Sequence, residues 1–300
     1  MPNNSFIYHI FNTKERYNII NKRNELCLKG MRKMKDYIKV FKRVEQKYLL
    51  TRNDFEKLMK ILEPKMEKNK YFESKILNIY FDTDNFDIAT KTIEKTKYKE
   101  KLRLRSYSVP KLDDENVFFE LKRKSNSVVS KRRITMKLNE FEEYIKYGKL
   151  FETENMQILK EIDYTKNTKK LKPKMMVAYD RLSYYLKGDE NTRITFDFDL
   201  RYRDEMLDLK MGDAGHKFFV NDVIIMEVKT LGSMPIWFVK IMNELKIYPA
   251  SFSKYGEIYK KHILSKKINN KKEELIINKN KVRKEYLNKD KIINKSIKIA

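Results

Sequence analysis

The segment KLRLRSY, Lys101–Tyr107, has the alternating pattern of a β-strand with two unlike faces. Successive side chains of a strand point to opposite sides of its sheet. One face therefore carries Lys101, Arg103, Arg105 and Tyr107. The other face carries Leu102, Leu104 and Ser106. The apolar residues predict packing against a core, and the row of cations predicts contact with either water or an anionic ligand.

Strands with the same division of faces recur along the chain. Segments rich in β-branched and aromatic residues predict strands at 41–50, 74–83, 97–108, 116–125, 128–138, 174–186, 192–203 and 222–230. Helical spacing of apolar residues predicts helices at 51–64, 139–151 and 235–247, the first of them capped by Thr51. Many strands with few helices predict an α+β fold with an antiparallel sheet, closed into a barrel or folded as a sandwich. A closed barrel would place the charged faces in a cation-lined tunnel, with the helices packed outside it.

The charged faces favour a phosphate-rich ligand over bulk water. Arginine recurs on them at matching places, whereas a solvated face commonly mixes Thr, Ser, Gln and acidic residues with Lys. Arginine suits phosphate because its planar guanidinium binds two oxygens at once and stays charged. The few acidic side chains among these cations are Glu45, Glu120 and Glu227. They are candidate ligands for Mg²⁺ or Mn²⁺, and the alternative is charge balance with neighbouring cations.

The composition agrees with a polyanionic partner and excludes several classes of protein. The 300 residues carry a formal net charge of +25, and 41% of them are hydrophobic, which is enough for a packed core. The single cysteine, Cys27, excludes an intramolecular disulfide and a cysteine metal cluster, and the three histidines lack ligand spacing. No apolar run reaches the length of a membrane span and the N-terminus lacks a secretory signal pattern, so a cytoplasmic location is expected. No GxxxxGK[ST] segment occurs, which excludes a P-loop ATPase.

The same pattern divides the chain into three parts. Residues 1–40 form a polar, basic N-terminal extension, and residues 41–262 hold all of the predicted strands. Residues 263–300 form a tail rich in Lys and Asn. A tail of this composition predicts a solvated segment, and the alternative is peripheral contact with an anionic membrane.

Eight segments complete the pattern in a fixed order. They are RVEQKYLL (43–50), NIYFDT (78–83), KLRLRSY (101–107), VFFELKRK (117–124) with VVSKRR (128–133), VAYDRLSYY (177–185), RITFDFDL (193–200), MEVKTLGSMPIW (226–237) and SFSKYGEIY (251–259). Together they resemble the catalytic domain of polyphosphate polymerases of the vacuolar transporter chaperone (VTC) type. These enzymes are triphosphate tunnel metalloenzymes, related to the CYTH phosphatases. The resemblance implies an antiparallel β-barrel closed into a tunnel, and transfer of the γ-phosphate of ATP onto a polyphosphate chain with Mn²⁺ or Mg²⁺.

The resemblance also implies roles for individual residues. It places phosphate ligands at Lys47, Arg103, Arg105, Lys122, Arg181, Arg193 and Lys254. It places a metal-holding carboxylate at Glu227, with Glu45 and Glu120 as further candidates. Additional substrate-binding positions are Arg43, Lys131, Arg133, Lys229, Ser253 and Tyr255. In CYTH relatives two alternating glutamates precede the first-strand lysine, whereas here Arg43 stands at the first of them, which favours a polymerase over a two-metal hydrolase.

Other functions remain open on the sequence alone. A tunnel hydrolase acting on tripolyphosphate, nucleoside triphosphate or thiamine triphosphate would use the same scaffold with water as the nucleophile. A non-catalytic polyphosphate-binding protein would keep the cations without turnover. A nucleic-acid-binding protein is not expected, because no helix-turn-helix, RRM or zinc-finger pattern is present. The expected partners are therefore ATP, polyphosphate and orthophosphate.

Overall fold

The computed structural model describes residues 43–110, 112–126 and 128–266, together with positions 268, 272, 273 and 279. The expected extension 1–40 and most of the expected tail 263–300 lie outside these residues. The chain divides into two units, and the larger one comprises Glu45–Thr230 with Met234 onward. Within the described residues, no helix is both long and apolar enough to cross a membrane.

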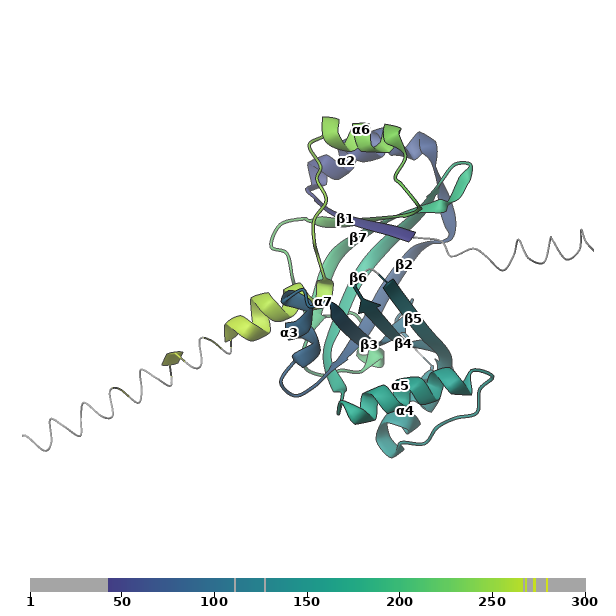
Figure 1. Cartoon of the computed structure of the whole chain (residues 1–300), viewed down its shortest axis with the longest axis vertical. Helices are drawn as coiled ribbons and strands as arrows, with labels where there is room; N and C mark the ends of the chain where they lie inside the picture. The colour runs from purple at the N-terminus through teal and green to yellow at the C-terminus, as the bar shows by residue number, and fades with distance from the viewer. Residues whose placement is uncertain are drawn as a thin grey trace, which may run out of the picture. The chain divides into compact units, whose positions relative to one another are not determined.

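A single antiparallel sheet organises this part of the chain (Figure 1). Its order is β1 (Arg43–Leu50), β9 (Ile224–Leu231), β7 (Asp189–Arg203), β6 (Lys172–Leu186), β2 (Met66–Asp82), β3 (Tyr98–Ser106), β4 (Asn116–Ser125) and β5 (Val128–Lys137). A short strand, β8 (His216–Lys217), pairs with β7 beside this path. The predicted α+β class with an antiparallel sheet is therefore confirmed, and every predicted strand is present.

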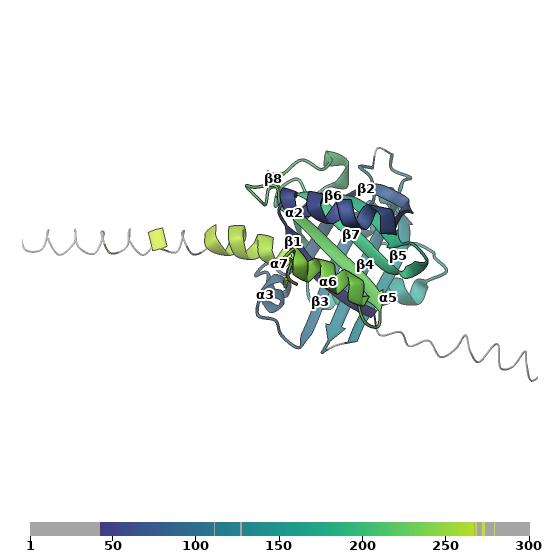
Figure 2. The same cartoon turned by 90° about the horizontal axis from the view of Figure 1, so that it is seen from above.

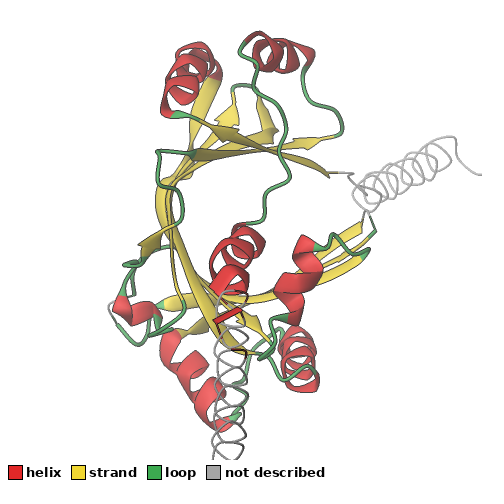
Figure 3. Cartoon of the chain, turned by 90° about the vertical axis from the view of Figure 1, so that its left-hand side faces the viewer, coloured by secondary structure: helices red, strands yellow, loops and turns green. Residues whose placement is uncertain are grey.

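The predicted closure of the sheet into a barrel is wrong for the described residues. The strand order ends at β1 on one side and at β5 on the other, and no pairing among the described residues joins these two strands. The sheet is instead strongly curved, as Figure 3 shows. A closed barrel and a curved open sheet both place alternate residues of each strand on one inner face. The alternation of side chains in the sequence therefore could not distinguish a barrel from an open sheet.

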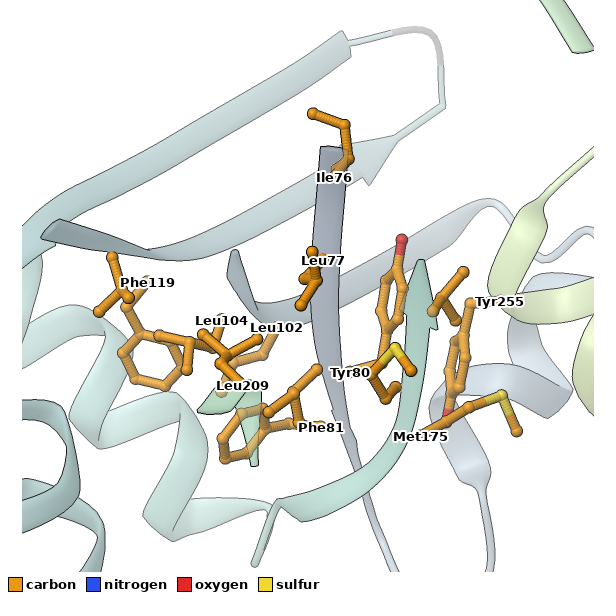
Figure 4. Close-up of a cluster of buried hydrophobic side chains, with 14 of the residues drawn as sticks. Ile76, Leu77, Tyr80, Phe81, Leu102, Leu104, Phe119, Met175, Leu209 and Tyr255 are labelled. Carbon is orange, nitrogen blue, oxygen red and sulfur yellow. The ribbon is translucent and has the colours of Figure 1, made fainter. Parts of the chain in front are cut away.

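Helices cover the outer face of the curved sheet at two places. α4 (Leu138–Tyr147) and α5 (Met156–Thr168) bury a core that includes Leu102, Leu104 and Phe119 (Figure 4). α2 (Arg52–Leu62) and α6 (Ile236–Glu244) lie side by side over a second core at β1, β7 and β9 (Figure 1, Figure 2). The prediction of helices packed outside the sheet is confirmed, since the apolar strand faces are the ones that they bury.

The first predicted helix begins at the expected cap. The Thr51 hydroxyl accepts a hydrogen bond from the Asp54 amide at 3.1 Å, and the Asp54 carboxylate accepts one from the Thr51 amide at 3.2 Å. This reciprocal capping satisfies two amides that would otherwise lack partners at the helix start. The sequence did not predict α3 (Asp87–Ile93), α5 or α7 (Lys254–Ile258), which continues into a π-helix, Tyr259–Leu264.

A buried carboxylate explains why the short helix α3 forms. Asp82 ends β2 and is fully buried, and it accepts hydrogen bonds from the amides of Ile88 and Ala89, each at 2.9 Å. It also accepts a hydrogen bond from the Tyr255 hydroxyl of α7 at 2.7 Å. Asp82 therefore ties α3 and α7 to the end of the same strand, and this contact fixes α7 beside the inner face.

Candidate active site

Glu120 organises a first group of charges on β3, β4 and β5. The strand register places Arg103, Glu120 and Arg133 directly opposite one another. Arg103 binds Oε2 of Glu120 through Nε at 2.8 Å and Nη2 at 2.7 Å. Arg133 Nε and Lys131 Nζ bind Oε1 at 2.6 and 2.8 Å. Burial opposes ionisation of Glu120, but Arg103 and its other cationic neighbours hold the pKa of this carboxyl far below its usual range.

This geometry supports the charge-balancing alternative for Glu120. Both of its oxygens already accept from cations, and its side chain is almost fully buried. A carboxylate engaged in this way has little capacity left for a metal ion. Glu120 instead fixes the positions of three cations that sequence analysis assigned to phosphate.

Arg105 continues the cationic row of β3 past Arg103. It is buried, and its Nε donates to Oδ1 of Asn78 at 2.8 Å. Arg103 also donates to the Tyr80 hydroxyl at 3.2 Å. Burial alone would raise the pKa of Tyr80, but Arg103, Lys101 and Arg105 lower it to about 8. A tyrosine with a lowered pKa reports a local excess of positive charge.

Asp197 organises a second group, on β6, β7 and α7. Arg181 grips it with two bonds, Nε to Oδ1 at 2.5 Å and Nη2 to Oδ2 at 2.8 Å. Lys254, the first residue of α7, binds Oδ2 at 2.5 Å and lies 4.5 Å from the centre of the Tyr179 ring. Burial would raise the pKa of Asp197, but Arg181 and Lys254 lower it. This carboxylate therefore pre-positions two of the predicted phosphate ligands.

A third group combines two carboxylates with two lysines on β1 and β9. Lys47 Nζ lies 3.6 Å from Glu45 and 3.8 Å from Glu227. Lys229 forms an ion pair with Glu227 and lies 3.8 Å from Glu45. Burial opposes ionisation of Glu227, but Lys229, Lys47 and more distant cations hold its pKa far below the usual range. Glu227 therefore stays charged in a nearly buried position.

The carboxylates of this third group are the best candidates for holding a divalent cation. Glu45 and Glu227 reach the same two lysines, so their oxygens lie in one small region. Mg²⁺ commonly takes one or two carboxylates and completes its shell with phosphate oxygens and water. Among the described residues no group of three or more His, Cys, Asp or Glu could hold a metal by itself. The donor set therefore fits a metal that arrives with a phosphate substrate.

The ends of the open sheet face each other across the inner face. Lys122 belongs to β4, yet the charges that act on it most are those of Glu45, Lys47 and Glu227 on β1 and β9. Burial first, and then the nearby lysines, lower its pKa. The pKa of Lys101 on β3 is also lowered, to about 8. Burial is the main cause, and the charges of Lys47 and Lys122 add to it, whereas Tyr80 acts in the opposite direction. Curvature thus brings the three charged groups to one inner region without strand pairing between β1 and β5.

Arg193 and Ser253 each lie beside a residue of this region. Arg193 pairs in register with Lys229, and its Nε donates to the Ser183 hydroxyl at 3.1 Å. Ser253 caps α7 by accepting from the Gly256 amide at 3.2 Å, and it also accepts from Lys101 Nζ at 2.8 Å. The side chain of Arg43 lies outside the described residues.

Tyr255 does not have the free hydroxyl that a substrate contact requires. Its hydroxyl donates to the buried Asp82, and its ring stacks on Tyr80 with centroids 4.7 Å apart (Figure 4). Only 1% of the residue is exposed. These contacts favour a structural role for Tyr255 over the expected contact with substrate. Tyr255 follows Lys254 in the chain, but successive residues of a helix point in different directions.

Tyr255→Phe is expected to lower the free energy of unfolding by about 1–3 kcal/mol, since it removes one donor from a buried carboxylate. It should leave phosphate binding nearly unchanged, because the hydroxyl is already committed to Asp82. Urea denaturation and tripolyphosphate titration of the same sample measure the two effects. A large loss of tripolyphosphate affinity with unchanged stability would restore the original assignment.

Sequence analysis missed several residues that complete the site. Asp197, Asn78, Tyr80 and Tyr179 each contact a predicted phosphate ligand. Lys101 was placed on the cationic face of its strand but was left out of the ligand set. Regular alternation does place Asp197 on the same face of its strand as Arg193. However, its partners come from β6 and α7, which one strand considered alone does not show.

The assembled region suits the binding of a linear or compact polyanion. It concentrates Lys and Arg from seven elements, and its acidic residues orient these cations rather than neutralise all of them. Cations held by fixed partners lose little freedom when an anion binds, which favours positioning and charge stabilisation. Among the described residues, the contacts contain no hydroxyl or thiol paired with a histidine, so the geometry does not favour a protein nucleophile.

The chain matches a family model and is similar to a curated protein. The family model described as the VTC domain matches residues 42–263. Vacuolar transporter chaperone complex subunit 4 of Schizosaccharomyces pombe is 29% identical over 156 residues, covering 44% of this chain and 21% of that protein. The chain therefore spans about a fifth of the length of this curated relative.

Two solved structures illustrate the structural comparison. A candidate adenylate cyclase from Bacillus halodurans aligns with a TM-score of 0.46 at 15% identity, covering 73% of this chain and 97% of that one. The Mimivirus capping enzyme triphosphatase aligns with a TM-score of 0.32 at 12% identity, covering 79% and 96%.

Proposed function

Because this chain belongs to the VTC domain family, we propose that it is a polyphosphate polymerase that transfers the γ-phosphate of ATP onto a polyphosphate chain. The observation that carries the proposal is the convergence of three cation groups, built on Glu120, Asp197 and Glu227, at one inner region. Two polyanions must meet in line for this reaction, and their mutual repulsion is the main obstacle. Fixed cations on both partners reduce that repulsion.

The reaction needs no general base from the protein. A terminal oxygen of the acceptor chain, or of orthophosphate at initiation, is already anionic near neutral pH and can attack the γ-phosphorus directly. A new P–O bond forms to the chain, the bond between the γ-phosphorus and the bridging oxygen breaks, and ADP leaves with that oxygen. Arg103, Arg105 and Lys122 would hold one partner. Arg181 and Lys254, which Asp197 holds in position, would hold the other.

Glu227 and Glu45 are the residues that would hold Mn²⁺ or Mg²⁺. A divalent cation bound there would supply additional charge stabilisation on phosphate oxygens. Lys47 and Lys229 contact both carboxylates and would orient them before substrate binds. These lysines are also near enough to contact phosphate oxygens at the same place.

The decisive experiment is incubation of the purified protein with ATP and Mn²⁺, followed by electrophoresis in a polyacrylamide gel stained for polyphosphate. A nuclease-resistant ladder of long polymer is expected. Orthophosphate without polymer would indicate instead a tripolyphosphatase or nucleoside triphosphatase. Absence of turnover with ATP, tripolyphosphate or polyphosphate would indicate a binding protein and would overturn the proposed activity.

Glu227→Gln is expected to reduce metal-dependent turnover by at least about a hundredfold, the scale of losing one pre-organised charge at a reacting centre. The amide keeps the size of the side chain but loses the charge that a divalent cation requires. Mn²⁺ binding by calorimetry and the circular dichroism spectrum are measured alongside turnover. Glu244→Gln, an exposed change on α6, is the control. Normal Mn²⁺ affinity and normal turnover in Glu227→Gln would contradict the metal assignment.

A further inference from the structure

A separate cationic pocket opens where β3 leaves the active site. It has a volume of about 510 Å³ and lies between β3, α3 and the residues of α7. Its lining includes Lys95, Lys99, Lys101 and Lys260. Two carboxylates, Glu94 and Glu257, also line it. Lys101 belongs both to this pocket and to the charged inner region described above.

The cations of β3 run from the active site directly into this pocket. Lys99, Lys101, Arg103 and Arg105 alternate along the strand and therefore share one face. At about 3.3 Å per residue, this row is about 20 Å long. Such a length exceeds the three phosphates of ATP. The row therefore continues beyond what a nucleoside triphosphate alone would need.

Like charges oppose each other along the outer half of this row. Strand register places Lys99 opposite Lys124, and Lys101 opposite Lys122. Directly opposed like charges destabilise a sheet unless something compensates them. Burial first, and then Lys124 and Lys95, lower the pKa of Lys99. The sheet thus concentrates positive charge at a place where it costs stability in the free protein.

The lysines of the pocket are not neutralised by ion pairs within the described residues. Arg103 and Arg133 share Glu120, whereas no ion pair in the described part of the chain includes Lys95, Lys99 or Lys260. The only described hydrogen-bond partner of the Lys101 ammonium is the Ser253 hydroxyl. An anion entering the pocket would therefore meet lysines that do not first have to give up a carboxylate.

The pocket suits a phosphate chain better than a nucleoside. A base would need an aromatic face or specific hydrogen-bonding groups, and Phe252 is the only aromatic residue of the lining. Its ring already stacks on Phe219, with centroids 5.8 Å apart. A chain of phosphates needs only closely spaced cations, and the lysines provide them.

We propose that this pocket is a subsite for the part of a long polyphosphate that extends beyond the reacting centre, held by Lys95, Lys99 and Lys260. The subsite makes the protein favour long polyphosphate over tripolyphosphate. Lys101 joins the subsite to the inner region, so the polymer follows the row of β3. This inference rests on the proposed function, since it takes polyphosphate as the ligand of the active site.

The test compares a triple variant, Lys95→Gln with Lys99→Gln and Lys260→Gln, with a control of equal charge change, Lys57→Gln with Lys60→Gln and Lys240→Gln on α2 and α6. Calorimetry measures the binding of long-chain polyphosphate, tripolyphosphate and ATP. The triple variant is expected to bind long-chain polyphosphate about tenfold more weakly, which is equivalent to about 1.4 kcal/mol. Three solvent-screened ionic contacts together contribute a binding free energy of about this size. Its affinity for tripolyphosphate and ATP should match that of the control. The double variant of the exposed Lys95 and Lys260 provides a second test if the triple variant unfolds.

The outcomes separate the subsite from the proposed function. If the unmodified protein binds and elongates polyphosphate but the triple variant keeps the long-chain affinity of the control, the subsite is refuted and the function stands. If the triple variant loses ATP affinity instead, the pocket holds the nucleotide and the inference is wrong. If the unmodified protein neither binds nor makes polyphosphate, both fail.

Discussion

Asp197→Ala is expected to lower the free energy of unfolding by about 3–5 kcal/mol, because it leaves two buried cations without their carboxylate. Arg181 and Lys254 both bind Asp197, and all three side chains are largely shielded from water. The loss should be measured by urea denaturation in a buffer free of phosphate and sulfate. Added tripolyphosphate should recover part of the lost stability, because it can replace the missing negative charge.

Asp180→Ala serves as the control for this prediction. Asp180 also contacts an arginine, since it lies 3.2 Å from Arg201, but 42% of its side chain is exposed. Exposed pairs of this kind contribute about 0–1 kcal/mol. Equal losses in the two variants would show that Asp197 has no special role in holding Arg181 and Lys254. Failure of tripolyphosphate to stabilise Asp197→Ala would place these cations away from the bound anion.

Arg103→Ala is expected to reduce turnover by about 10²–10³, the effect of removing one pre-organised charge from a reacting phosphate. Arg103 is held by Glu120 and Tyr80, so its guanidinium is already oriented before substrate arrives. Arg103→Lys should restore only part of the rate, because an ammonium cannot reproduce the planar two-pronged contact. Initial rates at saturating ATP and Mn²⁺ are the measurement.

Arg132→Ala is the matched control for Arg103→Ala. Arg132 lies on β5 of the same sheet, but it points outward and pairs with Glu161. Its removal should leave turnover about unchanged, as is usual for exposed pairs away from a site. A loss of less than about tenfold in Arg103→Ala, or under about 1.4 kcal/mol, would reduce Arg103 to an ordinary solvent-facing cation.

Strand alternation was sufficient to predict which face of a strand packs against helices. It placed Leu102 and Leu104 on the apolar face of their strand, and both are buried in the core. Alternation works here because a side chain's face follows from backbone geometry alone. It says nothing about pairing between side chains of different elements, so the partners of Glu120 and Asp197 could not be predicted from the sequence.

The regular alternation of side chains between the two faces of a strand is also interrupted at bulges. The pairing of β6 with β7 shifts register between Ala178 and Asp180 of β6. On the β7 side of this shift, Asp199 adopts a left-handed backbone with φ of 46°. Regular alternation would place Asp199 on the same face as Asp197. The structure pairs Asp199 with Arg201. A bulge of this kind inserts one residue and reverses the faces beyond it. No residue type in the segment marks the insertion.

The open order of the sheet affects how a polymer could be retained. A closed ring of strands around a polyphosphate chain would hold that polymer mechanically at any salt concentration. Here no strand pairing among the described residues links β1 to β5, so the sheet by itself does not form such a ring. Retention then depends on the density of fixed positive charge, which dissolved salt screens over about 10 Å at 0.1 M. If the chain is the polymerase proposed above, the number of phosphates added before the product escapes is therefore expected to fall as the salt concentration rises.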